Sequence, residues 1–239
     1  MHKILFFFSL IIIPFQFTLS SENDTLKPNY SFDFGSDIVS RYVWRGINLS
    51  ESPCIQPDFE FSYKHLVIGS WASYSFAKEP LQEVDMYLKY ETKFFSLSVC
   101  DYYNPVDSLG FQDDFLNWKK KTTRHSLEAI LEIHGPEGFP LEIEAGTMFF
   151  GNDRDVKMNN NYSTYLEMKY STRMNTIDFE PFIGMTFMDG LYGKAGLMNL
   201  GFRASKTISL SEKFELPVNI SFGLNPQVQR VYFVLACSF

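Results

Sequence analysis

The sequence has no long hydrophobic run beyond its first 21 residues, which argues against membrane-spanning helices, because these need roughly 18 or more consecutive apolar residues. Cysteines are also few. Cys54, Cys100 and Cys237 are odd in number and widely spaced, which is the pattern of neither a disulfide framework nor a zinc site, and we interpret them as incidental. No Pro/Gly/Ser-rich linker or low-complexity tract divides the rest, so residues 22–239 are predicted to form one domain.

Basic residues are outnumbered by acidic ones, with 21 Lys and Arg against 28 Asp and Glu. A nucleic-acid partner requires clustered Lys and Arg that neutralise phosphates, so this composition excludes nucleic-acid binding. The first residues combine a weak basic start at Lys3, an apolar run over 4–19 and small residues near Ser20, which predicts a secretory signal peptide over residues 1–21. A membrane-anchor helix is the alternative, but the run contains Pro14 and is shorter than the roughly 20 residues that a span needs.

Aromatic residues are abundant, at 17% of the chain with 25 Phe and 13 Tyr. From Tyr30 onward, apolar and polar residues alternate for about ten residues at a time, which is the period of a β-strand with one apolar face. In one such segment Phe59 and Phe61 share a face, opposite Asp58 and Glu60. The pattern predicts about twelve strands, near residues 31–44, 55–63, 66–76, 83–92, 94–103, 122–133, 140–150, 162–171, 176–187, 195–208, 214–224 and 229–239.

The connections between these strands differ in length at the two ends. With the first strand running outward, the inner turns are short and lie at 64–65, 92–93, 134–139, 172–175 and 209–213. The outer connections include longer ones, at 45–54, 104–121 and 151–161. Short inner turns with long outer loops are typical of outer-membrane barrels. The predicted fold class is therefore all-β: a transmembrane antiparallel up-and-down β-barrel of about 12 strands, of outer-membrane type.

A soluble β-sandwich is the alternative fold, because its strands also have one apolar face. The placement of aromatic residues favours the barrel, since Trp and Tyr prefer the headgroup depth of a membrane. Rings gather at the strand ends as Tyr42 with Trp44, Tyr74 with Phe76, Phe94 with Phe95, Tyr102 with Tyr103, and Phe149 with Phe150. These pairs predict two aromatic girdles.

The last predicted strand carries an apolar stripe on one face, made of Val231, Phe233, Leu235, Cys237 and Phe239. This stripe resembles the C-terminal signal by which outer-membrane barrels are handed to their insertion machinery, and we assign that role to Val231, Phe233, Leu235 and Phe239. The expected location is the bacterial outer membrane, with the C-terminus in the periplasm. The expected partners are outer-membrane lipid and the barrel-insertion machinery.

Residues 36–63, SDIVSRYVWRGINLSESPCIQPDFEFSY, resemble the opening of the TorF-type putative porin family of barrel-predicted outer-membrane proteins. The residues that carry this likeness are Arg41, Tyr42, Trp44, Arg45, Gly46, Gln56 and Pro57. Residues 83–90 and 216–235 are similar to the family's middle and end. Cys54 and Cys237 depart from the family pattern. The resemblance implies an envelope barrel and suggests a pore, and it supplies no catalytic residues.

The polar face of each predicted strand would line the lumen of the barrel, with an excess of acids. The predicted lumen and pore-lining residues are Arg41, Arg45, Asp58, Glu60, Glu83, Asp85, Lys89, Arg124, Glu128, Glu132, Glu142, Glu144, Glu167, Asp178, Glu180, Arg203 and Arg230. Asp33 and Asp37 fall on the same face. The charges either pair across strands and fill a narrow lumen, or leave a wet passage whose negative potential favours cations. Twelve strands lie between the packed interior of eight and the open channel of sixteen.

Arg41 and Arg45 are expected near the outer rim, where each either pairs with Glu83 or Asp85 or latches onto an outer-loop acid such as Asp107, Asp113 or Asp114. The loop at 104–121 carries Phe111, Phe115, Leu116 and Trp118. It either binds a partner or folds inward as a plug, and Asp113 and Asp114 are interpreted as solvated acids rather than a calcium site.

An enzyme is not predicted, because the adjacent His125 and Ser126 point to opposite faces of a strand and cannot act as base and nucleophile together. No catalytic, cofactor-binding or metal-binding residue is assigned, and no cofactor is expected. The predicted function is a monomeric or trimeric outer-membrane pore, porin-like, for the passive passage of small polar or cationic solutes through an acidic lumen. The alternative is a non-conducting barrel scaffold whose extracellular loops bind a partner.

Overall fold

The computed structural model describes residues 29–78, 81–105, 114–212 and 214–239. In this part of the chain every regular element is a β-strand. No helix in the described ranges is long and apolar enough to cross a membrane. The predicted signal peptide, residues 1–21, lies outside the described residues.

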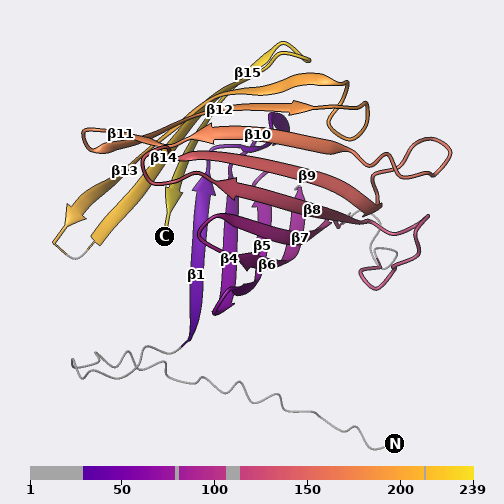
Figure 1. The fold of residues 1–239 in the computed structure, drawn as a ribbon, viewed down its shortest axis with the longest axis horizontal. Helices are drawn as coiled ribbons and strands as arrows, with labels where there is room; N and C mark the ends of the chain where they lie inside the picture. The colour runs from indigo at the N-terminus through magenta and orange to yellow at the C-terminus, as the bar shows by residue number, and fades with distance from the viewer. Residues whose placement is uncertain (1–28, 79–80, 106–113, 213) are drawn as a thin grey trace, which may run out of the picture.

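Twelve antiparallel strands close into a barrel (Figure 1). The wall is formed by β1 (Tyr30–Val39), β4 (Cys54–Tyr63), β5 (Leu66–Ser75), β6 (Gln82–Glu91), β7 (Phe95–Tyr103), β8 (His125–His134), β9 (Leu141–Gly151), β10 (Thr164–Tyr170), β11 (Thr172–Met174), β12 (Ile177–Thr186), β13 (Gly196–Ser211), β14 (Phe214–Asn225) and β15 (Arg230–Ser238). β10 and β11 are two parts of one wall strand, interrupted at Ser171, because both pair with β12. The wall closes because β10 also pairs with β9, and β1 with β15. This confirms the predicted all-β, up-and-down barrel of about twelve strands.

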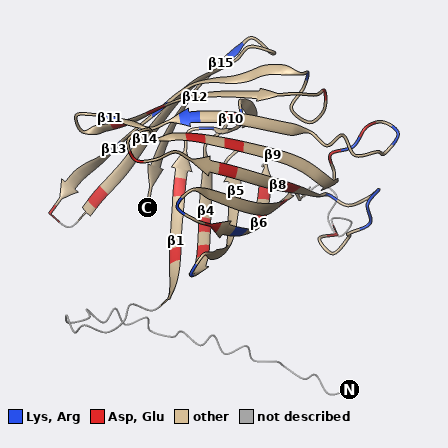
Figure 2. Cartoon of the chain, viewed as in Figure 1, with Lys and Arg blue, Asp and Glu red and all other residues tan. Residues whose placement is uncertain are grey.

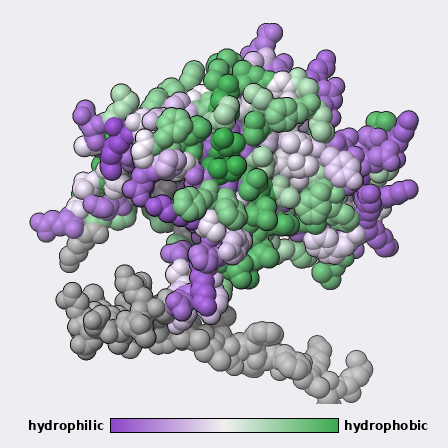
Figure 3. Space-filling model, viewed as in Figure 1, coloured by the Kyte–Doolittle hydropathy of each residue, from purple (hydrophilic) through white to green (hydrophobic). Residues whose placement is uncertain are grey.

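The apolar face of each strand points away from the barrel axis. Val231, Phe233 and Leu235 on β15, and Phe239 directly after it, are all exposed on the outer surface, with Phe233 53% and Leu235 44% exposed. A soluble sandwich would bury such a face against a second sheet, whereas a barrel leaves it open to hydrocarbon while all wall strands pair with neighbours. Hydrophobic side chains gather over the middle of the outer surface and hydrophilic ones at its ends (Figure 3). The wall strands therefore have the construction of transmembrane strands.

The connections at one end of the barrel are all short, and the long connections lie at the other end, which also has short ones such as 226–229. The short turns lie at 64–65, 92–94, 135–140, 175–176 and 212–213, at the end where β15 finishes. The long connections span 104–124, 152–163 and 187–195. We call the second end the long-loop end.

The first connection is the exception, since it enters the barrel instead of extending from it. β1 ends at Val39, so the strand predicted over residues 31–44 is wrong in its last part. The chain then forms β2 (Tyr42–Trp44) and β3 (Ile47–Ser50), which pair only with each other. Tyr42 and Trp44 therefore lie within the lumen rather than in a girdle, because Trp44 packs on Tyr102 and Tyr42 on Trp71, both of which face inward.

Candidate functional site

The lumen is partly filled by the β2–β3 hairpin, whose tip is the pair Arg45 and Gly46. Trp44 and Ile47 are paired across the tip, and φ is +49° at Arg45 and +78° at Gly46. Two positive φ values are what a two-residue type I′ turn requires. A Cβ at Gly46 would lie 2.6 Å from the carbonyl oxygen of Met198, so a glycine is needed where the tip touches the wall.

Arg45 anchors this tip to the far wall of the lumen. One guanidinium nitrogen lies 2.6 Å from Glu128 on β8 and the other 2.7 Å from Glu144 on β9. Arg45 also donates to the hydroxyl of Tyr192 at 2.5 Å, and its guanidinium lies over the ring of Tyr165, 4.7 Å from the centroid. The Arg45 side chain is 8% exposed and that of Glu128 is fully buried. Charge-assisted hydrogen bonds of this kind are the strong ones, and they hold the left-handed Arg45 in place.

Glu128 is itself enclosed by hydroxyl donors. Tyr102 donates to it at 2.7 Å and Tyr192 at 3.1 Å. On the opposite side, the side-chain amide of Asn225 donates to the carbonyl of Gly46 at 3.1 Å. Because β8, β9 and β14 all hold the hairpin tip, the half of the lumen near the long-loop end is constricted by chain that belongs to no wall strand.

Arg45 does not bind the acids expected from the sequence. Pairing with Glu83 or Asp85 was the simpler expectation, and it is wrong because the hairpin carries Arg45 across the lumen to β8 and β9. Asp114, one proposed latch partner, instead accepts a hydrogen bond from the backbone of its own loop at Leu116. The other two, Asp107 and Asp113, lie outside the described residues.

Two further bases of the lumen pair with acids on other strands, whereas Lys89 lies 2.8 Å from Glu91 on its own strand, β6. Lys169 lies 2.6 Å from Glu142 and 3.5 Å from Glu144. Arg203 lies 2.6 Å from Glu180 and 3.2 Å from Glu167. The side of the barrel formed by β8 to β13 is therefore lined by compensated charge.

The opposite side, formed by β1 and β4, carries acids without bases (Figure 2). Asp33, Asp37 and Asp58 face the lumen, and the described part of the chain contains no ion pair to any of them. The charged groups that act on Asp58 are Asp37, Glu60 and Asp33, all acidic. We call Asp33, Asp37 and Asp58 the acidic wall.

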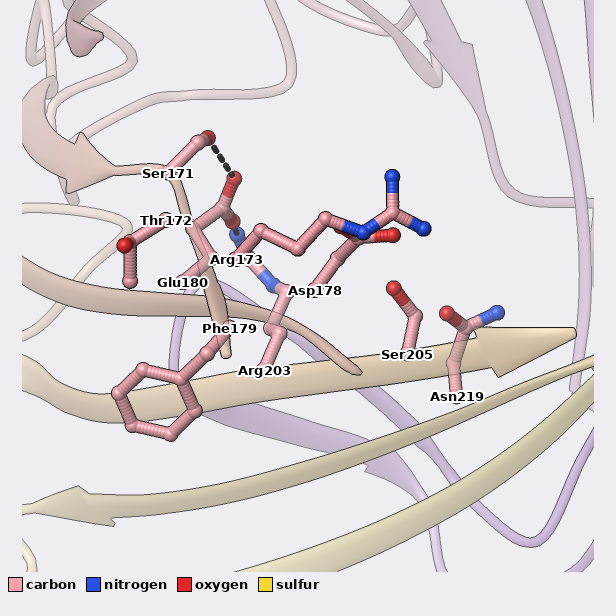
Figure 4. Close-up of a pocket in the computed structure, with 9 residues that line it drawn as sticks. All are labelled: Ser171, Thr172, Arg173, Asp178, Phe179, Glu180, Arg203, Ser205 and Asn219. Atoms are coloured by element: carbon pink, nitrogen blue, oxygen red, sulfur yellow. Dashed lines mark hydrogen bonds and ion pairs between the residues drawn. The ribbon is translucent and has the colours of Figure 1, made fainter. Parts of the chain in front are cut away.

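Two cavities follow one another along the lumen. The larger, about 570 Å³, lies between β11, β12, β13 and β14 and is lined by Arg173, Asp178, Arg203, Ser205 and Asn219 among others (Figure 4). The smaller, about 150 Å³, lies between the hairpin and the wall and includes Arg41, Arg45 and Tyr232. Arg203 lines both, so the cavities adjoin beside the hairpin.

The structure places most predicted lumen residues on the inner face. On wall strands these are Asp58, Glu60, Glu83, Asp85, Lys89, Glu128, Glu132, Glu142, Glu144, Glu167, Asp178, Glu180 and Arg203. Arg124 and Arg230 lie at the rim instead, because one precedes β8 and the other begins β15. Arg124 donates to the carbonyl of Asn104 at 3.3 Å, and Arg230 lies 3.7 Å from the exposed Glu51.

The loop after β7 is fixed to the outside of the barrel. His125 shares the outward face with Asp101, and its Nδ1 lies 2.8 and 2.9 Å from the two carboxylate oxygens of Asp101. Its Nε2 lies 2.7 Å from the carbonyl oxygen of Phe115, and Trp118 stacks on the ring at 3.9 Å. Both ring nitrogens of His125 therefore lie within hydrogen-bonding distance of an oxygen atom. The described part of the loop thus covers the outer wall and does not enter the lumen as a plug.

Replacing His125 with alanine is expected to detach this loop. The change removes the stack with Trp118 and leaves the carboxylate of Asp101 without its partner, a loss of about 1–3 kcal/mol. Lys119, Lys120 and Lys121 are exposed in the loop, so trypsin should cut there faster, by roughly 5- to 150-fold if cleavage follows the opened population. Fragment masses after limited proteolysis measure the rate. His134→Ala, at the opposite end of the barrel, is the control, and equal rates in all three proteins would contradict the assigned contact.

The next long connection, 152–163, is held by turns of its own. The exposed Asp155 accepts from the backbone and side chain of Asn159 and from the backbone of Lys157. The hydrogen bonds from Asn159, more than that from Lys157, hold the pKa of this carboxyl below its usual value. The turn therefore keeps its negative charge at neutral pH.

The histidines show no arrangement of base and nucleophile among the described residues. Nε2 of His125 faces a backbone carbonyl, and Ser126 points to the opposite face of β8. His65 lies beside the carbonyl of Glu91, and His134 lies 3.7 Å from Glu142. Nor do three or more His, Cys, Asp or Glu side chains of the described ranges converge in a way that could hold a metal ion.

Sequence reasoning missed three residues of these sites. Tyr192 and Tyr165, which enclose Arg45, lie in a loop and on a strand with no signal that marks them. Asp101 did carry a signal, because it follows Leu97 and Val99 on an apolar outward face, where a carboxylate needs a partner.

Comparison of the chain with models of known protein families gives no match, and comparison with curated proteins gives none either.

Proposed function

We propose that this barrel is an outer-membrane pore for small polar or cationic solutes, narrowed by the β2–β3 hairpin. The observation that carries the proposal is the pair of adjoining polar cavities beside the hairpin, with Arg203 on the border between them. A barrel whose lumen were only a packed core would bury its charges in pairs. Here the acids Asp33, Asp37 and Asp58 face the lumen without bases, which suits water and passing cations.

The location and partners belong to the same proposal. The outward stripe of Val231, Phe233, Leu235 and Phe239 is the proposed insertion signal, read by the barrel-insertion machinery. The short-turn end would then lie in the periplasm, and the long-loop end outside the cell. We also propose membership of the TorF-type putative porin family. Its support is that Tyr42, Trp44, Arg45 and Gly46, which carry the resemblance, together build the constricting hairpin.

Conductance of the refolded barrel in planar bilayers tests the proposal. A steady single-channel current is expected, and its reversal potential in a salt gradient should show that cations pass more readily than anions, because the uncompensated charge in the lumen is negative. Anion preference would contradict the assigned acidic wall.

The alternative function is a non-conducting scaffold whose loops bind a partner. It is favoured by one observation, the filling of the outer lumen by the hairpin. Absence of current both in the native barrel and in a variant with the hairpin released would support the scaffold and remove the pore.

A further inference from the structure

Glu83 and Asp85 differ from the other acids of the lumen. They lie two positions apart at the start of β6, on its inner face near the long-loop end, and they are only 5% and 8% exposed. Each has one carboxylate oxygen, Oε2 of Glu83 and Oδ1 of Asp85, with no hydrogen-bond partner. Both side chains are therefore buried, adjacent and incompletely satisfied.

No base compensates this pair in the described part of the chain. The charged groups that act on Asp85 are Glu83 and Asp101, both acidic. Tyr42 and Asn104 form hydrogen bonds with Glu83, and both are neutral groups. The hairpin arginine, Arg45, is engaged on the other side with Glu128 and Glu144. Buried charges need compensation, and two adjacent carboxylates without a base are compensated when a cation binds between them.

The oxygen atoms around the pair suit a hard cation. Besides the two carboxylates they include the hydroxyl of Tyr42 and that of Ser73, which lies directly opposite Glu83 on β5. Ca²⁺ takes six to eight oxygen ligands from carboxylates, neutral oxygens and water. We propose that Glu83 and Asp85 form a binding site for a divalent cation of the Ca²⁺ class in the outer half of the lumen. Two carboxylates are few for such a site, so the expected dissociation constant is about 10⁻⁴–10⁻³ M.

Terbium luminescence tests this site in the refolded barrel, because Tb³⁺ occupies calcium sites and emits when a nearby indole or phenol transfers energy to it. Trp71 lies directly opposite Asp85 on β5 and 5.4 Å from the ring of Tyr42, so it is placed to sensitise the ion. Excitation of tryptophan should give saturable emission that Ca²⁺ displaces. In the double variant Glu83→Gln, Asp85→Asn, affinity should fall by roughly tenfold or more, since the ligand charge is lost.

Glu142→Gln is the control, because it removes a lumen acid that is paired with a base, Lys169. It should keep the emission and the affinity of the native barrel. Altered mobility of the unheated barrel on a denaturing gel verifies that each variant folds. Emission unchanged in the double variant would mean that Tb³⁺ binds elsewhere on this acidic chain, and no emission from the native barrel would mean that the two carboxyls share a proton. Either result overturns the proposal, and neither depends on whether the lumen conducts.

Discussion

Replacing Arg45 with alanine is expected to release the β2–β3 hairpin from the lumen wall and to raise the single-channel conductance severalfold. The guanidinium binds Glu128 and Glu144, and Glu128 is fully buried. Removing one partner of such a buried pair leaves an uncompensated charge and costs about 3–5 kcal/mol. When the hairpin tip moves away from the wall, water can reach the carboxylates of Glu128 and Glu144. The hairpin of the variant should therefore spend most of its time away from them. Planar-bilayer recordings measure the change as larger and noisier current steps.

The barrel itself should survive this change, because β2 and β3 pair with no wall strand. Arg173→Ala is the matched control, since Arg173 pairs with Asp178 in the larger cavity and is 69% exposed. Its conductance should stay close to that of the native protein. The conductance of Arg45→Lys should lie between those of the native protein and Arg45→Ala, because an ammonium lacks the planar fork with which a guanidinium binds two carboxylates at once. Current steps of native size in Arg45→Ala would show that the hairpin does not limit flow.

The wall of the barrel was predictable from the sequence because the environment of its side chains alternates regularly between hydrocarbon and lumen. Each strand must pair along its whole length and turn one face to hydrocarbon, so an alternation of apolar and polar residues sets both register and direction. The predicted strand near 55–63 differs from β4 by one residue at one end. The strand predicted near 162–171 contains β10, but β11 was predicted as part of the turn at 172–175, and that part of the prediction is wrong because Thr172–Met174 pair with β12.

The hairpin was not predictable in the same way. Tyr42 and Trp44 continue the alternation of the first strand, so the sequence pattern alone extends that strand to Trp44. The chain is held inside the barrel by hydrogen bonds between Arg45 and two acids, Glu128 and Glu144, which are more than 80 residues away in the sequence. A local signal was nevertheless present, because Arg45 and Gly46 can form a type I′ turn. The partners of a buried charge depend on which faces the closed barrel brings together.

Neutralising the acidic wall is expected to weaken cation preference strongly. The triple variant Asp33→Asn, Asp37→Asn, Asp58→Asn removes three lumen charges that have no base partner, while every side chain keeps its size. The remaining lumen charge then consists of ion pairs such as Arg203 with Glu180, together with a few further acids such as Glu83 and Asp85. The reversal potential measured across a salt gradient should therefore move toward zero. The shift should be larger at 0.1 M salt, where the screening length is about 10 Å, than at 1 M, where it is about 3 Å.

The matched comparison is a triple variant of paired acids, Glu142→Gln, Glu167→Gln, Glu180→Gln. It removes the same number of charges but leaves the acidic wall intact and frees Arg203, while Lys169 keeps Glu144, so the reversal potential should shift less than in the first variant and still show cation preference. The two variants thus differ in outcome only if pairing, and not the total of acids, sets the potential in the lumen. Equal shifts in both would mean that net charge alone decides which ions pass. Unchanged cation preference in the first variant would place the selective step away from β1 and β4.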